Sequence, residues 1–129
     1  MNKLSVLLIE DNRDDEELAI WILKKIGLDN ITVARNGLQA ITILHGDNDS
    51  GVEATCKPDI IILDLRLPEI DGLDVLRIVR ADECTKDIRV YALTSSEDPY
   101  DRQVCNELGV PAFFAKPLTE KAVLDLNLF

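Results

Sequence analysis

The sequence IIILDLRLPEIDG, residues 60–72, places an acidic residue between an unbroken aliphatic run and a loop. Four consecutive aliphatic residues that end in a turn are typical of a strand buried on both faces. Asp64 directly follows this run. Ligands of open α/β sheets bind outside the carboxyl ends of the strands, so Asp64 is a candidate reactive group.

Similar aliphatic runs alternate with helical patterns along the chain. We expect strands at residues 4–9, 31–34, 59–63, 88–93 and 112–115. Asn12 or Asp14 can cap the first helix, and Gly27 ends it. Thr119 can cap a short last helix. A strand–helix unit repeated five times predicts a parallel sheet with helices on both faces and right-handed crossovers.

The composition excludes several classes of protein. The chain has 129 residues, of which 47% are hydrophobic, and this indicates one globular domain of ordinary size. The net charge is −10, which argues against nucleic acid or an anionic membrane as a direct partner. This charge is compatible with binding of a divalent cation or of a basic protein surface.

The sequence shows no targeting or membrane signal. No apolar stretch reaches the roughly 18 residues that a membrane span needs, and no signal peptide precedes the first expected strand. Cys56, Cys84 and Cys105 are odd in number and widely spaced, which suits neither a zinc site nor a disulfide framework. We therefore expect a cytoplasmic protein with reduced thiols and no membrane partner.

Polar residues follow four of the expected strands: Glu10 and Asp11, Asp64, Thr94, and Lys116. If these strands are neighbours, the side chains converge on one site. Clustered carboxylates repel one another unless a cation intervenes, and hard oxygen ligands suit Mg²⁺. A lysine and a hydroxyl can bind phosphoryl oxygens. The combination predicts phosphoryl transfer, with an acyl phosphate on Asp64 as the product.

Each of these residues also has a simpler interpretation. An acidic pair after a strand usually caps a helix, a threonine there is usually a turn residue, and a lysine before proline is usually solvated. The joint occurrence of these residues, each at the carboxyl end of its own strand, favours the phosphoryl-transfer site.

The pattern resembles the receiver domain of two-component response regulators, from about residue 3 to the end of the chain. The matching segments are VLLIEDN (6–12), IIILDLRLPEIDGLDVL (60–76), ALTS (92–95) and FFAKP (113–117). The resemblance implies a flavodoxin-like (βα)5 fold, with a doubly wound five-stranded parallel sheet in the strand order 2-1-3-4-5. It also implies that residues 1–129 form a single receiver domain.

The resemblance further implies a magnesium site and a phosphorylation site. Glu10, Asp11 and Asp64 would hold Mg²⁺, together with the backbone carbonyl of Arg66. Asp64 would accept a phosphoryl group from a sensor histidine kinase. Members of the family catalyse their own phosphotransfer and autodephosphorylation, so we expect a phosphoacceptor and not an enzyme that acts on other substrates.

The resemblance also implies a conformational switch. Thr94 and Lys116 would bind the phosphoryl oxygens, and Phe113 would fill the space behind Thr94. The surface of the fourth helix, fifth strand and fifth helix would then change and control a downstream protein target. The Lys116–Pro117 peptide is typically cis in the family. We expect a monomer or a homodimer, with output through a protein contact.

Some residues depart from the common family pattern. Phe113 stands where tyrosine is frequent, so it has no hydroxyl to donate. Arg66 stands where many relatives carry Asn or Met, and with Ser96 it flanks the approach of water. We expect Arg66 to alter the lifetime of the phosphorylated state. Residues 46–57, a loop or a helix extension, are similar to single-domain regulators paired with phytochrome-type kinases.

Other functions fit the sequence less well. A degenerate receiver could act as a phosphorylation-independent binding module, but every reactive position is filled. A flavodoxin-type protein needs a hydroxyl- and glycine-rich phosphate loop, where Glu10 and Asp11 would repel phosphate. An aspartate-nucleophile phosphatase needs a second aspartate where Arg66 stands.

The remaining polar residues suggest no function. We expect His45 to be a surface residue, and Arg77 and Arg80 to form a solvated helix face. The apolar end, residues 126–129, either packs against the domain or serves as a partner surface.

Overall fold

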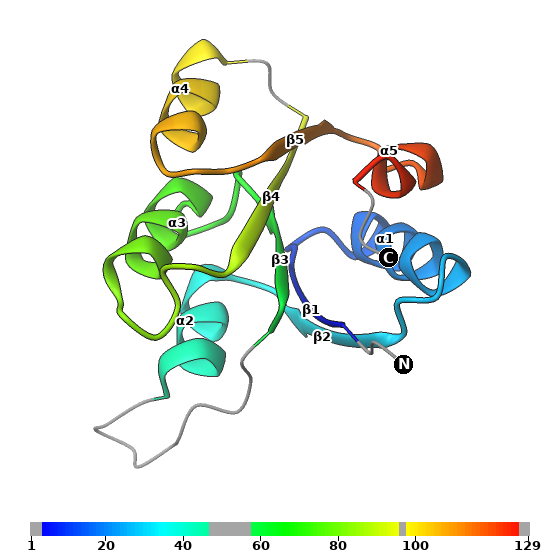
Figure 1. Cartoon of the computed structure of the whole chain (residues 1–129), viewed down its shortest axis with the longest axis horizontal. Helices are drawn as coiled ribbons and strands as arrows, with labels where there is room; N and C mark the ends of the chain where they lie inside the picture. Colours follow the sequence, from blue (N-terminus) through cyan, green and yellow to red (C-terminus); the bar gives the residue numbers. More distant parts are fainter. Residues whose placement is uncertain (1–3, 47–57, 96–97, 127–129) are drawn as a thin grey trace.

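Strands and helices alternate in the computed structural model, which describes residues 4–46, 58–95 and 98–126. The elements are β1 (Ser5–Ile9), α1 (Arg13–Lys25), β2 (Asn30–Ala34), α2 (Gly37–His45), β3 (Ile60–Asp64), α3 (Gly72–Ala81), β4 (Arg89–Thr94), α4 (Pro99–Glu107), β5 (Ala112–Ala115) and α5 (Glu120–Leu124). These strands pair in parallel in one sheet, in the order β2-β1-β3-β4-β5 (Figure 1). The predicted α/β class, a flavodoxin-like doubly wound sheet, is confirmed.

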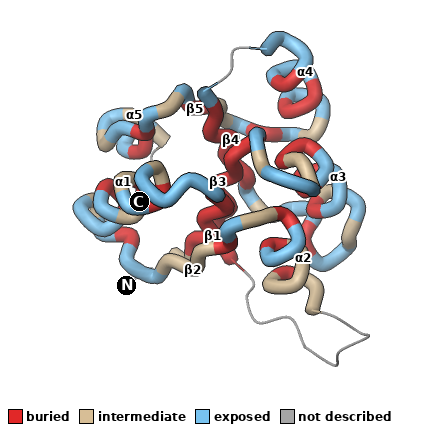
Figure 2. Tube along the Cα trace, turned by 180° about the vertical axis from the view of Figure 1, so that it is seen from behind, coloured by how far each residue is buried: buried red, intermediate tan, exposed pale blue. Residues whose placement is uncertain are grey.

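Helices cover both faces of the sheet. Helices α1 and α5 lie on one face, and α2, α3 and α4 lie on the other (Figure 1). Successive strand residues point to opposite faces, so Leu7 and Ile61 join the core under α2–α4, whereas Leu8 and Ile62 join the core under α1 and α5. Both faces of the central strands are buried (Figure 2), which explains the all-aliphatic run of residues 60–63.

Short polar side chains begin the first and last helices. The Asn12 side chain accepts a hydrogen bond from the Asp15 amide at 3.0 Å, and Thr119 accepts one from the Ala122 amide at 3.2 Å. Gly27 follows α1 with a φ of 96°, a conformation that favours glycine. Because α1 begins so soon after β1, its first turn lies at the carboxyl edge of the sheet.

Arg80 does not lie on a solvated face, so that prediction was wrong. Its guanidinium donates to the carbonyls of Leu108 at 2.6 Å, Ile88 at 2.7 Å and Lys86 at 2.9 Å. The long stem lets the charged head reach carbonyls of residues that lie outside the helices and strands. Arg80 thus ties α3 to the end of α4 and to the segment before β4. Arg77 is exposed, as expected.

His45 is more buried than expected for a surface residue, since only 18% of its side chain is exposed. Its Nε2 lies 3.3 Å from Thr85 Oγ1, which itself donates to the Val79 carbonyl at 2.7 Å. Thr85 Oγ1 therefore accepts from His45. The pair joins the end of α2 to the segment between α3 and β4.

Some predictions fall outside the described residues. They are the loop or helix extension at residues 47–57, Ser96, and the end of the chain at 127–129. None of the helices in the described part of the chain has the length and apolar character needed to cross a bilayer.

Candidate functional site

The carboxyl ends of β1, β3, β4 and β5 meet at one edge of the sheet. Ile9 pairs with Leu63, so the residues that follow β1 lie beside Asp64. On the other side of β3, the Lys116 amide donates to the Thr94 carbonyl at 2.9 Å. The Lys116–Pro117 peptide is cis, as the resemblance implies. The strand order thus brings together four segments that are far apart in sequence.

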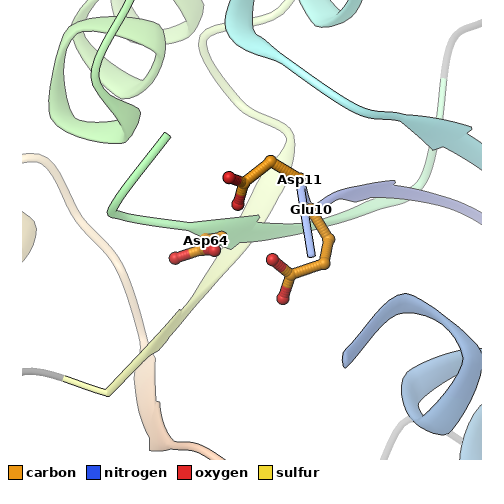
Figure 3. A group of neighbouring side chains, drawn as sticks. All are labelled: Glu10, Asp11 and Asp64. Carbon is orange, nitrogen blue, oxygen red and sulfur yellow. The ribbon is translucent and has the colours of Figure 1, made fainter. Parts of the chain in front are cut away.

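Three carboxylates cluster at this edge. Glu10 and Asp11 follow β1, and Asp64 ends β3 (Figure 3). One oxygen from each lies within 4.8 Å of the others. Glu10 is 0% exposed and Asp64 is 3% exposed, whereas Asp11 is open to solvent. The cluster is therefore buried on one side and accessible on the other.

Lys116 provides the positive charge of the site. Its Nζ lies 2.8 Å from Glu10 Oε1, 2.9 Å from Asp15 Oδ2 and 3.0 Å from Asp64 Oδ2. Only 14% of the lysine side chain is exposed. Asp11 lies beside Glu10 and Asp64 and brings the number of carboxylates at the site to four. Because Lys116 is the one amine that the described residues place among them, the carboxylates outnumber the positive charge in the metal-free site.

The pKa values reflect this crowding. Burial, together with a hydrogen bond to Asp64, raises the pKa of Glu10 to about 8. Burial alone would lower the pKa of Lys116, but its contacts with Glu10, Asp15 and Asp64 outweigh burial and raise it. Lys116 therefore stays charged at neutral pH, while the metal-free site retains a proton on Glu10.

The residues fit a hard divalent cation. Mg²⁺ prefers carboxylate, carbonyl and water oxygens, and the three clustered carboxylates supply such ligands. Glu10 Oε1 is buried and has no hydrogen-bond partner among the described residues, although Lys116 Nζ lies 2.8 Å from it. This oxygen thus keeps a lone pair for a metal ion. The proposed carbonyl ligand from Arg66 stays a prediction.

Arg66 contacts Asp64 through its backbone and α4 through its side chain. The Arg66 amide donates to Asp64 Oδ1 at 3.0 Å. Its guanidinium lies 2.6 Å from Asp101 Oδ2 and 3.7 Å from Asp98 Oδ2. Arg66 also lines an open cleft of ≈ 440 Å³. The other residues of this cleft are Asp11, Asn12, Asp15, Asp64, Ser95, Lys116 and Pro117.

Gly72 holds the loop after β3 close to the strand. A Cβ at this position would clash with the carbonyl oxygen of Asp64 and with the backbone of Leu65. The Gly72 amide also donates to the Leu65 carbonyl at 3.3 Å. The glycine of the IDG segment therefore lets α3 begin directly behind Asp64.

Thr94 is buried, whereas Phe113 is only partly buried. Thr94 ends β4 and is 1% exposed. Phe113 pairs with Ala92, two residues before Thr94, and packs against the core under α2–α4. The Arg102 guanidinium lies 4.9 Å from the centre of the Phe113 ring. Phe113 also lines a groove of ≈ 290 Å³ between α4 and β5.

Of the predicted site residues, Asp11, Asp64, Arg66 and Lys116 line the cleft. Glu10 and Thr94 are buried, Phe113 lines the separate groove between α4 and β5, and Ser96 lies outside the described residues.

The structure adds two residues that the sequence interpretation missed. Asp15 contacts Lys116, but in the sequence it is an ordinary acidic residue of a first helical turn. Asp101 contacts Arg66 across 35 positions of sequence, and no local pattern indicates that pairing.

Comparison with known proteins identifies the family. The family described as response regulator receiver domain matches residues 6–126. Response regulator Rcp1 of Synechocystis sp. PCC 6803 is 33% identical over 112 residues, which cover 86% of this chain and 75% of Rcp1. The chain spans only 42% of the transcriptional regulatory protein SphR of Synechococcus elongatus, which is 29% identical over 112 residues, 87% of this chain.

Solved structures of response regulators are also similar to this chain. The bacteriophytochrome response regulator AtBRR is 37% identical, with a TM-score of 0.80 over 100% of this chain and 96% of AtBRR. The Mn(2+)-bound form of Rcp1 is 31% identical, with a TM-score of 0.81 over 95% of this chain and 88% of the Rcp1 chain.

Proposed function

Because the chain belongs to the response regulator receiver domain family, we propose that it is a phosphorylation-dependent signalling switch. Residues 1–129 act as one receiver domain that accepts a phosphoryl group on Asp64 from a sensor histidine kinase. One observation carries this proposal: the Lys116 amine lies 3.0 Å from Asp64 Oδ2, beside carboxylates with oxygens within 4.8 Å of one another.

The transfer uses the geometry around Asp64. Its carboxylate oxygen attacks the phosphorus atom of phosphohistidine, and a P–O bond forms while the P–N bond breaks. The imidazole leaves with the electron pair and takes up a proton. The Arg66 amide and the Lys116 amine bind the two oxygens of Asp64, so the carboxylate is already oriented. Mg²⁺ bound by Glu10, Asp11 and Asp64 would neutralise charge between the nucleophile and the phosphoryl group.

The product acts as a signal through packing. Lys116 and the Thr94 hydroxyl bind phosphoryl oxygens, and Phe113 fills the space that Thr94 leaves. Phe113 already lines the groove between α4 and β5, so its movement changes the α4–β5–α5 surface. A downstream protein target recognises this surface. The domain is thus a phosphoacceptor and has no turnover on external substrates.

Two relatives support Mg²⁺ as the cofactor and a phytochrome-type sensor kinase as the partner. Rcp1 is known in a Mn(2+)-bound form, and in this chain Glu10, Asp11 and Asp64 offer hard oxygen ligands to a divalent cation. AtBRR is a bacteriophytochrome response regulator, which favours a phytochrome-type sensor kinase as the phosphoryl donor. A cytoplasmic location belongs to the same proposal, because Cys84 and Cys105 are both free thiols.

The direct test is phosphorylation with a small donor. The protein is incubated with acetyl phosphate and Mg²⁺, and its intact mass is measured. We expect one added phosphoryl group in the wild type and none in Asp64→Asn or after chelation of the metal. A wild type that gains no mass would instead favour the alternative, a degenerate receiver that binds its partner without phosphorylation.

A further inference from the structure

An ion pair between partly exposed Arg66 and buried Asp101 joins the candidate phosphorylation site to α4. The Arg66 guanidinium lies 2.6 Å from Asp101 Oδ2, and Asp101 lies in the first turn of α4. Asp98, the N-cap of the same helix, lies 3.7 Å from the guanidinium. Ion pairs therefore hold the start of α4 against the loop that follows Asp64.

The two partners of the ion pair differ in exposure. The Asp101 side chain is 3% exposed, whereas the Arg66 side chain is 48% exposed. Burial raises the pKa of Asp101, Arg66 opposes this shift, and Asp98 and Asp71 add to it. A buried carboxylate that loses its cation is strongly destabilised. Asp101 therefore depends on Arg66 more than Arg66 depends on Asp101.

Arg66 also faces the site where a phosphoryl group would form. Its amide donates to Asp64 Oδ1, and Arg66 lines the same cleft as Lys116. A phosphoryl group on Asp64 presents several charged oxygens, and a guanidinium binds such oxygens with paired hydrogen bonds. The phosphoryl group and Asp101 are thus competing anions for one cation.

We propose that Arg66 and Asp101 form a latch that couples phosphorylation of Asp64 to the position of α4. In the unphosphorylated protein the ion pair holds the first turn of α4 against the loop after β3. A phosphoryl group on Asp64 draws the guanidinium away, and the buried Asp101 is left without it, so the start of α4 moves. This route to α4 runs beside that of Thr94 and Phe113, and it rests on the proposed phosphorylation of Asp64.

The latch predicts a reciprocal effect on the phosphoryl site. If the phosphoryl group opens the latch, a protein without the latch must bind a phosphoryl mimic more tightly. Beryllofluoride is such a mimic, because it forms a tetrahedral adduct on an aspartate carboxylate. Asp101→Asn removes the competing charge while leaving Arg66 in place.

The test is a titration with beryllofluoride in excess Mg²⁺ of four proteins: wild type, Asp101→Asn, Arg66→Gln and the double variant. We expect Asp101→Asn to tighten binding roughly 5- to 150-fold, the usual range for coupled sites. In the Arg66→Gln background, Asp101→Asn should change nothing. Arg77→Gln is the matched control and should leave binding unchanged, because Arg77 also contacts α4, through the Tyr100 hydroxyl at 3.2 Å, but does not line the cleft.

Two different failures can be distinguished. Equal binding by wild type and Asp101→Asn, or an effect of Asp101→Asn that persists without Arg66, would overturn the latch and leave Asp101 as a residue of the helix start only. No binding by the wild type would overturn the proposed function itself.

A second measurement does not depend on folding of the variants. In the wild type, beryllofluoride should shift the NMR signals of the Arg66 Nε–H group and the Asp101 carboxyl carbon. Unchanged signals in the bound protein would overturn the latch.

Discussion

Magnesium binding should release a proton from Glu10 and should strengthen as pH rises. Glu10 is fully buried, and burial with the Asp64 hydrogen bond raises its pKa to about 8 in the metal-free protein. A carboxyl group with a raised pKa is protonated below that value, and Mg²⁺ needs the carboxylate. Binding is therefore weakened at low pH, and the penalty disappears once pH exceeds the raised pKa.

The size of the effect follows from the pKa. With a pKa of about 8, the protonated fraction weakens Mg²⁺ binding roughly tenfold at pH 7 and has almost no effect at pH 9. The Mg²⁺ affinity at pH 7 should in turn be roughly ten times the affinity at pH 6. Calorimetric titration in buffers of different ionisation enthalpy measures both the affinity and the protons released.

The control is Glu10→Gln, which cannot hold the proton. Its Mg²⁺ affinity should be lower than that of the wild type at pH 9 and nearly independent of pH. A wild-type affinity that stays constant from pH 6 to pH 9, with no proton release, would refute the assignment of Glu10 as a buried, protonated ligand.

Further predictions concern the scaffold of the site. Arg80→Leu should lower the free energy of unfolding by about 2–3 kcal/mol, because three hydrogen bonds to carbonyls are lost from a partly exposed arginine; urea denaturation should show a clearly smaller loss for Arg77→Leu, and equal losses would contradict this role. Gly72→Ala should cost about 1–3 kcal/mol by overpacking and slow phosphorylation by acetyl phosphate, and unchanged stability would count against the close approach. A thiol reagent at pH 8 should label exposed Cys84 but spare buried Cys105, whose pKa is raised to about 11; labelling of both in the native protein, as mapped on peptides, would disagree.

The sequence predicts the fold because its signals are local. The aliphatic run at residues 60–63 must be buried on both faces, and only a sheet covered by two helical layers provides that environment. Glu10, Asp64 and Lys116 could be predicted as neighbours for the same reason, since each follows a strand and parallel strands end at one edge.

The remaining contacts depend on tertiary packing. Asp15 looks like any acid in a first helical turn, and only the direction of α1 brings it to Lys116. Arg80 occupies a polar position on α3, yet its length carries the charge to carbonyls at the end of α4. Asp101 meets Arg66 only because α3 and α4 are adjacent on the same face of the sheet. Contacts of this kind join residues far apart in sequence, so no local sequence pattern indicates them.

The proposed function requires Asp64 to carry the phosphoryl group. After reaction with acetyl phosphate and Mg²⁺, borohydride reduces an acyl phosphate of aspartate to homoserine, and peptide sequencing by mass spectrometry locates it. We expect homoserine at position 64 alone, dependent on Mg²⁺ and absent without the phosphoryl donor. Homoserine at position 11 or 15, or at no position, would contradict it.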